Sequence, residues 1–381
     1  MTSPRDPTVP VRALLDGWVA SGRVPGYVVA LRHAGTTHVL HGGTADAAGA
    51  VPVTPATVFR LSSVSKLVGA VLALALVDDG TLGLDDPVGT WLPGLASPGV
   101  LRDRLGPLDD VVPAERPVTV RHLLTGTSGW GGIWEPCPLA EAVDRAGVGP
   151  GPWAPDLDPE TYVDRLAGIP LAAQPGTTWL YHVGSDLLGV VLARAAGRPV
   201  SELLRDRVTG PLGLGSTGFW APAERLSAAW WATEDGGLRV VDTPDGRFSR
   251  PPAFESLAAG LVSTAEDVLG LLTAVADGGG GVLRPATVAE MTRDQLTPGQ
   301  RAGEQEFLGA GVSWGLHVGV DVGQDPAWGG PGRWGWDGGT GTSAWVDPGR
   351  DVAAVVLTQR GMLTTEDSLE PFWRAVAAGV G

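Results

Sequence analysis

The sequence predicts an α+β fold: one antiparallel sheet built from both ends of the chain, flanked by helices, with a mostly helical lobe inserted between the two ends. Two observations predict this fold. Residues 27–43 and 342–360 are rich in alternating and β-branched apolar residues, as strands are. Between them, apolar residues recur every three or four positions, as on one face of a helix. Such an order fits a single sheet with helices packed against it.

The first part of the chain supplies one side of this sheet. Residues 1–10 are rich in proline and are predicted to form a flexible tail. Residues 11–22 have the apolar spacing of a helix, which ends at Gly22. Residues 27–43 are then predicted to form two strands joined by a turn at Ala34-Gly35.

Helices dominate the middle of the predicted fold. The apolar run after the serines at 62–65 predicts a helix that ends near Gly80. The same spacing of three or four predicts further helices at 118–124, 159–168, 185–197 and 201–208. The segment 129–158 is dense in Gly, Pro and Trp, which favours an ordered loop over a site rather than a linker.

The last third of the chain returns to the sheet. A helix is predicted over 263–278, with a capping box from Ser263 to Glu266, and a strand over 309–320. Residues 342–360 predict a strand, a turn and a second strand, before a closing helix at 369–379. The active site is expected between two subdomains. Their predicted bounds are 11–62 with 255–381 for the sheet subdomain and 63–254 for the mostly helical one.

Composition limits the kind of molecule. The chain has 381 residues, of which 43% are hydrophobic and 18% charged, as expected of a globular protein with one core or two closely packed subdomains. The net charge of −15 repels phosphate backbones and argues against a nucleic-acid partner. The single cysteine, Cys137, excludes an internal disulfide.

The sequence carries no signal for a membrane anchor, a metal or a cofactor. The longest apolar stretch, 67–77, is far shorter than the roughly 20 residues of a membrane span. The first residues lack the apolar run of a secretory signal, so we expect a cytoplasmic protein. The histidines form no H-E-x-x-H pattern, and His38 and His41 fall on opposite faces of a strand. The glycines at 278–281 lack the Lys-Ser/Thr that completes a phosphate loop.

The stretch FRLSSVSKLVGA, residues 59–70, contains the strongest candidate nucleophile. A serine hydroxyl attacks well when a neighbour takes its proton, and a lysine can do so when burial lowers its pKa. Ser63 stands three residues before Lys66, which places both on one helix face. Ser65 points elsewhere, and Ser62 falls at the helix cap. The amide at position 63 can also face a developing oxyanion. The alternative is a capped helix whose lysine reaches solvent.

Two further segments carry possible chemistry. Tyr181, one of three tyrosines, precedes a predicted helix, and a phenol near an ammonium loses its proton more easily and can act as a general base. Its alternative role is packing against the end of that helix. The Gly-rich segment 333–348, around Gly338, lets a substrate lie against the backbone and offers an amide to an oxyanion. Its alternative is an ordinary hairpin loop.

These motifs together resemble the serine β-lactamase and penicillin-binding-protein superfamily, in particular its class C-like branch, which includes family VIII carboxylesterases and lovastatin-type acyltransferases. The resemblance spans roughly residues 11–375 and implies a β-lactamase/transpeptidase-like fold. It rests on S-V-S-K at 63–66, Y-H-V at 181–183, W-D-G at 336–338 and RPVTVRHLLTGTSGW at 116–130.

The resemblance implies a role for individual residues. Ser63 attacks the acyl carbonyl after Lys66 and Tyr181 have removed its proton. The amides of Ser63 and Gly339 form the oxyanion hole. Trp336 lines the side of the site that holds the acyl group or the leaving group.

Two positions depart from the family pattern. The second motif usually ends in Asn, where this chain has Val183, and the third usually begins with Lys or His, where it has Trp336. Both changes favour apolar, uncharged acyl groups over β-lactams and peptides. His182 either touches substrate or belongs to a polar network at the helix start. Asp186 is expected to bond backbone near the site.

The predicted function is carboxylic ester hydrolysis through an acyl-Ser63 intermediate, on small or medium apolar acyl esters and without a cofactor. Its partner is a small-molecule ester or acyl donor. Acyl transfer, hydrolysis of β-lactams or D-amino peptides, and an inactive binding protein remain as alternatives. The G-x-S-x-G at 311–315 offers Ser313 as a rival nucleophile, but the residues after it predict a strand rather than the helix of a nucleophile elbow.

Overall fold

A seven-stranded antiparallel sheet forms the centre of the protein in this computed structural model, which describes residues 6–302, 305–309, 311–323, 328–362 and 367–381. The strand order is β2-β1-β13-β12-β11-β10-β9. The strands are β1 (Gly26–His33), β2 (Thr36–Gly43), β9 (Val312–Trp314), β10 (Gly319–Asp321), β11 (Trp334–Gly338), β12 (Thr342–Asp347) and β13 (Val352–Thr358). The N-terminal hairpin pairs with the last strand, with Val29 opposite Val356. The prediction of one sheet built from both chain ends is confirmed.

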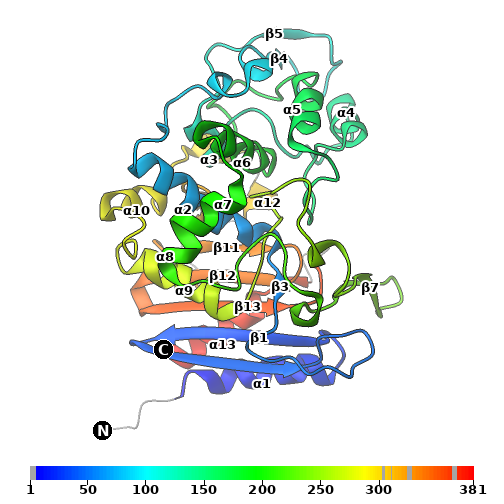
Figure 1. Ribbon diagram of the computed structural model, residues 1–381, viewed down its shortest axis with the longest axis vertical. Helices are drawn as coiled ribbons and strands as arrows, with labels where there is room; N and C mark the ends of the chain where they lie inside the picture. The colour runs from blue at the N-terminus through cyan, green and yellow to red at the C-terminus, as the bar shows by residue number, and fades with distance from the viewer. Residues whose placement is uncertain (1–5, 303–304, 310, 324–327, 363–366) are drawn as a thin grey trace.

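Helices cover both faces of this sheet (Figure 1). Helices α1 (Thr8–Ala20) and α13 (Glu370–Val380) pack together on one face, and α9 (Ala265–Ala276) contacts β1, β12 and β13 from the other. Strands that are covered on both faces are apolar throughout. All seven residues of β13, VAAVVLT, are accordingly buried.

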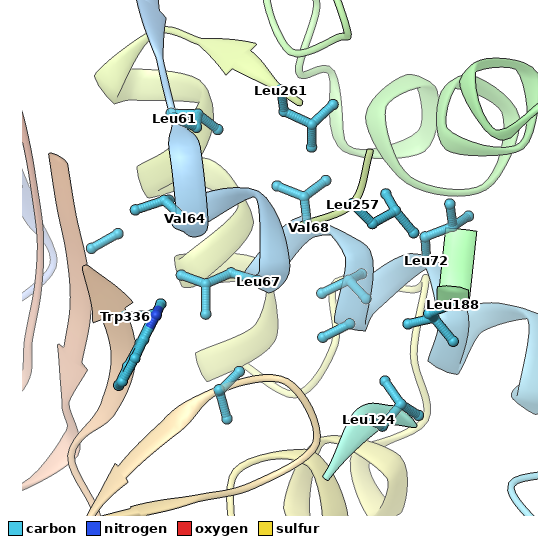
Figure 2. Close-up of a cluster of buried hydrophobic side chains, with 14 of the residues drawn as sticks. Leu61, Val64, Leu67, Val68, Leu72, Leu124, Leu188, Leu257, Leu261 and Trp336 are labelled. Carbon is cyan, nitrogen blue, oxygen red and sulfur yellow. The ribbon is translucent and has the colours of Figure 1, made fainter. Parts of the chain in front are cut away.

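Helix α2 (Ser65–Asp78) is the central helix of the protein. Every residue from Ser65 to Leu76 is buried, because this helix is apolar on all sides and has protein around it on all sides. It contacts α6 (Val183–Ala196) and strand β11. Figure 2 shows Leu67 on the side of α2 that faces Trp336 of β11. The start of α2 therefore lies where the helical part of the chain meets the sheet.

Shorter elements complete the fold. The remaining helices are α3 (Val120–Leu124), α4 (Pro138–Ala146), α5 (Pro159–Ala167), α7 (Val200–Leu204), α8 (Gly210–Leu212), α10 (Pro285–Met291), α11 (Pro298–Arg301) and α12 (Gln305–Leu308). The remaining strands form three pairs, β3 (Phe59–Arg60) with β8 (Val262–Ser263), β4 (Gly99–Leu101) with β5 (Val111–Pro113), and β6 (Ala229–Ala232) with β7 (Leu238–Asp242). Short helical turns that bear on the site include η1 (Ser62–Val64).

Three local predictions are wrong. The tail does not reach residue 10, because α1 begins at Thr8, whose amide and hydroxyl both donate to Asp6; residues 1–5 lie outside the described residues. The strand over 309–320 is instead the two strands β9 and β10, joined by a turn in which the Gly315 amide donates to the Val318 carbonyl. Apolar residues continue to alternate with other residues through the turn, so the sequence pattern did not reveal the turn.

The third correction concerns the start of α9. The capping side chain is Thr264, whose hydroxyl accepts from the Asp267 amide at 3.2 Å, and not Ser263. Ser263 ends strand β8 instead. The expected loop over 129–158 contains the nine-residue helix α4, which its prolines and glycines concealed.

The predicted subdomain boundaries stay predictions. The two positions at which the chain passes between the predicted subdomains lie together, because β3 pairs with β8 and Phe59 lies opposite Ser263. Among the described residues, no helix has both the length and the apolar character that crossing a bilayer requires.

Candidate active site

The three serines at the start of α2, Ser62, Ser63 and Ser65, lie in three different environments. Lys66 donates a hydrogen bond from Nζ to Ser63 Oγ over 3.2 Å, and both side chains are buried. Ser65 Oγ instead accepts from the Leu261 amide at 3.1 Å, which ties α2 to the neighbouring segment. Ser62 Oγ is buried and has no hydrogen-bond partner in the described part of the chain. Ser63 is thus the serine that meets the lysine.

The backbone before the nucleophile candidate is strained. Ser62 has a φ of +45°, in the left-handed region that non-glycine residues rarely adopt. Strain of this kind persists only where the surrounding structure holds it in place, and it gathers at functional sites. The turn at Ser62 lets strand β3 pass directly into the helix that presents Ser63.

Lys66 is buried beside the serine, and this burial lowers its pKa. Its side chain is fully buried, and Nζ donates a second hydrogen bond to the Ala258 carbonyl at 2.9 Å. Burial lowers the pKa of Lys66 to about 7, because the charged ammonium loses its hydration, while the negative charge of Asp186 acts in the opposite direction. A large fraction of the lysine is therefore neutral near pH 7.

Tyr181 lies against Lys66 through its ring rather than its hydroxyl. Lys66 Nζ is 4.4 Å from the centroid of the tyrosine ring, and the hydroxyl accepts a hydrogen bond from Trp336 Nε1 at 2.7 Å. Burial raises the pKa of Tyr181 above its ordinary value, against the lowering effect of its hydrogen bonds with Ser63 and Trp336. Burial therefore favours the neutral phenol further, so Tyr181 is a stronger candidate for a proton donor than for a phenolate base.

Trp336 belongs to a tightly packed aromatic group. Its ring meets Trp314 edge to face at 4.7 Å between centroids and lies 5.9 Å from the Tyr181 ring. Trp179 packs against Tyr181 at 5.7 Å. Edge-to-face and tilted contacts at these distances are favourable for aromatic pairs. They fix the position of the tyrosine hydroxyl relative to Ser63.

The end of strand β11 passes close to the nucleophile candidate. A Cβ on Gly338 would lie 2.2 Å from Thr342 Oγ1 and 2.3 Å from the Leu61 carbonyl oxygen, so this position accepts glycine alone. Among the described residues, the amides of Ser63 and Gly339 donate no hydrogen bond within the protein. Both residues line the same cavity. Two unused N–H groups there are suited to an oxyanion.

This cavity has a volume of about 710 Å³ and is dominated by aromatic side chains. Its wall includes Ser63, Tyr181, His182 and Gly339 among the predicted site residues. The segment 129–158 contributes to it, as predicted for a loop over a site. The aromatic lining residues are Trp134, Tyr181, Phe307, Trp328, Trp336, Trp345 and Trp373.

A tight turn at His182 decides which of His182 and Val183 lies at the cavity. His182 has φ +84° and ψ −63°, and the Val183 amide donates to the Tyr181 carbonyl at 3.2 Å, which is the geometry of a rare, strained γ-turn. The turn brings His182 to the cavity. Val183 instead lines a separate small cavity beside Leu139 and Val143. The predicted placement of Val183 at the substrate is therefore wrong, and position 183 offers the cavity no side chain.

A buried polar network behind Lys66 was missed by sequence reasoning. Ser256 Oγ donates to Asp186 Oδ1 at 2.5 Å and accepts from the amides of Ala258 and Ala259. Asp186 thus acts on the backbone through a serine, rather than directly as expected. This network holds the Ala258 carbonyl to which Lys66 donates. The segment PPAFESLAAG has no motif that could have revealed it.

The rival nucleophile Ser313 lies elsewhere. It belongs to strand β9, is fully buried and donates its hydrogen bond to Asp294. The neighbouring histidine, His317, has its Nε2 3.0 Å from Ser185 Oγ instead. Burial lowers the pKa of His317 to about 3, so it stays neutral. Ser313 therefore has neither the exposed turn nor the base of a nucleophile elbow.

Comparison with known proteins identifies the family. A family model described as Beta-lactamase matches residues 11–378. The chain belongs to the β-lactamase family. The resemblance drawn from the S-x-x-K, tyrosine and W-D-G motifs is thereby confirmed.

Relatives within the β-lactamase family include ester-cleaving proteins. The chain is 33% identical to esterase EstB of Burkholderia gladioli over 91% of this chain and 88% of EstB. The solved structure of EstCE1, described as a hydrolase with promiscuous acyltransferase activity, has a TM-score of 0.84 at 28% identity, with 98% of each chain covered. Simvastatin synthase LovD of Aspergillus terreus has the same fold, with a TM-score of 0.80 at 21% identity and 98% coverage of both chains.

Proposed function

We propose that this member of the β-lactamase family is a serine ester hydrolase that works through an acyl-Ser63 intermediate. The observation that carries the proposal is the buried 3.2 Å contact between Lys66 Nζ and Ser63 Oγ. A lysine with a pKa near 7 is a base at neutral pH, and a serine needs such a base to act as a nucleophile. The esterase relatives support the same reaction class.

In the proposed reaction, neutral Lys66 takes the hydroxyl proton as Ser63 Oγ bonds to the ester carbonyl carbon. The carbonyl oxygen becomes an oxyanion and accepts hydrogen bonds from the amides of Ser63 and Gly339. When the intermediate collapses, the bond to the alkoxide breaks, and the alkoxide takes a proton from the Lys66–Tyr181 pair. Neutral Lys66 then takes a proton from a water molecule as the water oxygen bonds to the acyl carbon. The bond between that carbon and Ser63 Oγ breaks, Oγ takes the proton back, and the carboxylic acid is released.

We assign Tyr181 the role of a proton donor and relay in this cycle. Its raised pKa keeps the phenol protonated, and its hydrogen bond from Trp336 fixes where the hydroxyl points. Such a group can pass a proton to the leaving alkoxide, and a water molecule that enters for deacylation can carry the proton of the Lys66 ammonium back to the phenolate. A positioned acid or base of this kind contributes a factor on the order of 10²–10⁴ in rate.

The proposed substrates have an apolar group next to the ester carbonyl. Trp336 occupies the position at which other members carry Lys or His. Beside it, the ring of Phe307 packs against that of Tyr181 at 4.6 Å between centroids, with the two ring planes tilted by 43°. A β-lactam carboxylate would find no lysine or arginine in the described lining of the cavity. We therefore expect kcat/KM for short p-nitrophenyl esters to exceed that for nitrocefin by a large factor.

The decisive experiment combines labelling with turnover. A fluorophosphonate probe should label Ser63, and Ser63→Ala should lose both the labelling and the hydrolysis of p-nitrophenyl butyrate. The matched control is Ser65→Ala, which removes a neighbouring hydroxyl that only bonds backbone. Retained turnover in Ser63→Ala would refute the assignment, and a wild-type protein that is neither labelled nor active would support a binding protein.

Acyl transfer is the second candidate. It uses the same acyl-Ser63 and differs only in whether an alcohol or a water reaches it. The cavity volume of about 710 Å³ leaves room for an acceptor beside a small acyl group, and EstCE1 is described as having promiscuous acyltransferase activity. The measurement is the ratio of ester to acid formed from vinyl butyrate as benzyl alcohol is added.

A further inference from the structure

Three carboxylates line the described part of the active-site cavity, and two of them are paired with arginines. Asp321 forms an ion pair with Arg333 at 3.0 Å, and Glu370 forms one with Arg374 at 2.5 Å. The third, Asp337, has no ion-pair partner in the described part of the chain. No lysine or arginine lies among the described residues that line this cavity. Its wall therefore carries one carboxyl group that has no ion-pair partner in the described structure.

Asp337 is held in place by neutral donors through one oxygen alone. Its Oδ1 accepts from the Ser343 hydroxyl and from Trp345 Nε1, the latter at 2.9 Å. Trp373 Nε1 in turn donates to Ser343 Oγ at 2.8 Å, which fixes the serine. Within the described structure, Asp337 Oδ2 accepts no hydrogen bond, and the residue lines the cavity. This geometry orients a carboxylate oxygen without neutralising it.

The aromatic side chains around Asp337 are suited to a cation. The guanidinium carbon of Arg333 already lies 4.2 Å from the ring centroids of Trp345 and Trp328, on the protein side of the wall. Arg333 forms its ion pair with Asp321, which leaves Asp337 without one. Burial raises the pKa of Asp337, because its carboxylate is poorly hydrated. A cation beside Oδ2 would replace that missing hydration.

We propose that Asp337 binds a positively charged nitrogen, a quaternary ammonium or a protonated amine, on the ester substrate. The proposal rests on the proposed esterase function, because it assumes that an ester occupies the cavity. The reacting end of the substrate stays apolar, against Trp336 and Phe307. The cation lies two residues back along strand β11 from Gly339, whose amide faces the reacting carbonyl.

The test compares esters that differ only in charge. Acetylthiocholine and S-3,3-dimethylbutyl thioacetate place a cationic nitrogen or an uncharged carbon in the same alcohol portion. 4-Nitrophenyl esters of 4-trimethylammoniobutanoic acid and 5,5-dimethylhexanoic acid make the same comparison in the acyl portion. We expect kcat/KM to favour the cation by about tenfold or more in one of the two pairs. Sodium chloride at 1 M should reduce this preference in the wild type.

Asp337→Asn keeps an acceptor for Ser343 and Trp345 but removes the charge, so the preference should fall to near one. Asp351→Asn is the matched control, because it removes an exposed carboxylate at the turn between β12 and β13, outside the cavity lining, and should keep the preference. Preference for the cation in neither pair, or an undiminished preference in Asp337→Asn, would overturn the proposal. Ser63→Ala separates it from the esterase assignment, since that variant should lose turnover of all four esters.

Discussion

Lys66 lies over the face of Tyr181, with its Nζ 4.4 Å from the ring centroid, while the same nitrogen reaches Ser63 Oγ at 3.2 Å. The lysine therefore contacts the serine oxygen and the tyrosine ring, but not the tyrosine hydroxyl. That hydroxyl accepts a hydrogen bond from Trp336 and also interacts with Ser63. In this arrangement the base, Lys66, is largely neutral from about pH 7 upward, whereas the acid, Tyr181, stays protonated.

The pH dependence of kcat/KM should report this base. With a pKa of about 7 for Lys66, the neutral fraction falls tenfold for each pH unit below 7 and saturates above it. Hydrolysis of an uncharged ester should therefore rise from pH 5 to 7 and level off by about pH 8. Lys66→Arg, which stays charged, should be inactive throughout this range. A flat profile between pH 5 and 8 would contradict the role of Lys66.

Removing the charge of Asp186 should move that profile. The negative charge of Asp186 favours the protonated lysine, so it opposes the lowering of the Lys66 pKa by burial. Asp186→Asn should shift the midpoint of the pH profile to lower pH. Ser256→Ala, which keeps the carboxylate but breaks its link to the Ala258 loop, should lower kcat with a smaller change of midpoint. Equal midpoints in wild type and Asp186→Asn would exclude this electrostatic effect.

Tyr181→Phe tests the proton donor with little change in packing. The ring and its contacts with Lys66 and Trp179 remain, and only the hydroxyl is lost. We expect kcat to fall by a factor on the order of 10²–10⁴. Trp336→Phe, which removes the donor to that hydroxyl, should lower kcat by a smaller factor, about tenfold. A Tyr181→Phe effect confined to KM would show that the hydroxyl only binds substrate.

Alanine substitutions at Gly338 and at Gly339 test how closely the end of strand β11 approaches the Ser63 segment. Alanine at 338 would place its Cβ 2.3 Å from the Leu61 carbonyl oxygen, so the strand must move away from the Ser63 segment. Gly338→Ala should lower kcat/KM at least 100-fold and reduce the free energy of unfolding by about 1–3 kcal/mol. The nearest atom to a Cβ at 339 is Ser62 Oγ at 3.6 Å, so Gly339→Ala should fold with an unchanged Tm. Equal Tm values for both variants would contradict this close approach.

Local patterns were sufficient for the overall fold and for the core of the candidate site. The spacing of Ser63 and Lys66 on one helix face predicted their contact, and the apolar run after them predicted the burial that lowers the lysine pKa. The apolar runs near both chain ends predicted the strands of the sheet. The turn between β9 and β10 was missed because apolar alternation runs through it without a break.

The rest depends on tertiary contacts that no short window contains. A strained γ-turn decides that His182, and not Val183, lies at the active-site cavity. Residue propensities do not predict its φ of +84°. Ser256 becomes important only because Asp186, 70 residues earlier, is brought to it. The raised pKa of Tyr181 follows from its burial in the folded protein, which its neighbours in sequence do not reveal.

Because β1 pairs with β13, the central sheet cannot be completed until β13 has been synthesised. The partner of β1 on one side, with Val29 opposite Val356, is made more than 300 residues after β1 itself. Contacts so distant in sequence form slowly and late. During translation the nascent chain therefore exposes an apolar strand edge, GYVVALRH, for as long as the remaining chain takes to be made. Ser63 is synthesised long before strand β11, so it gains the amide of Gly339 only after the whole intervening chain has been made.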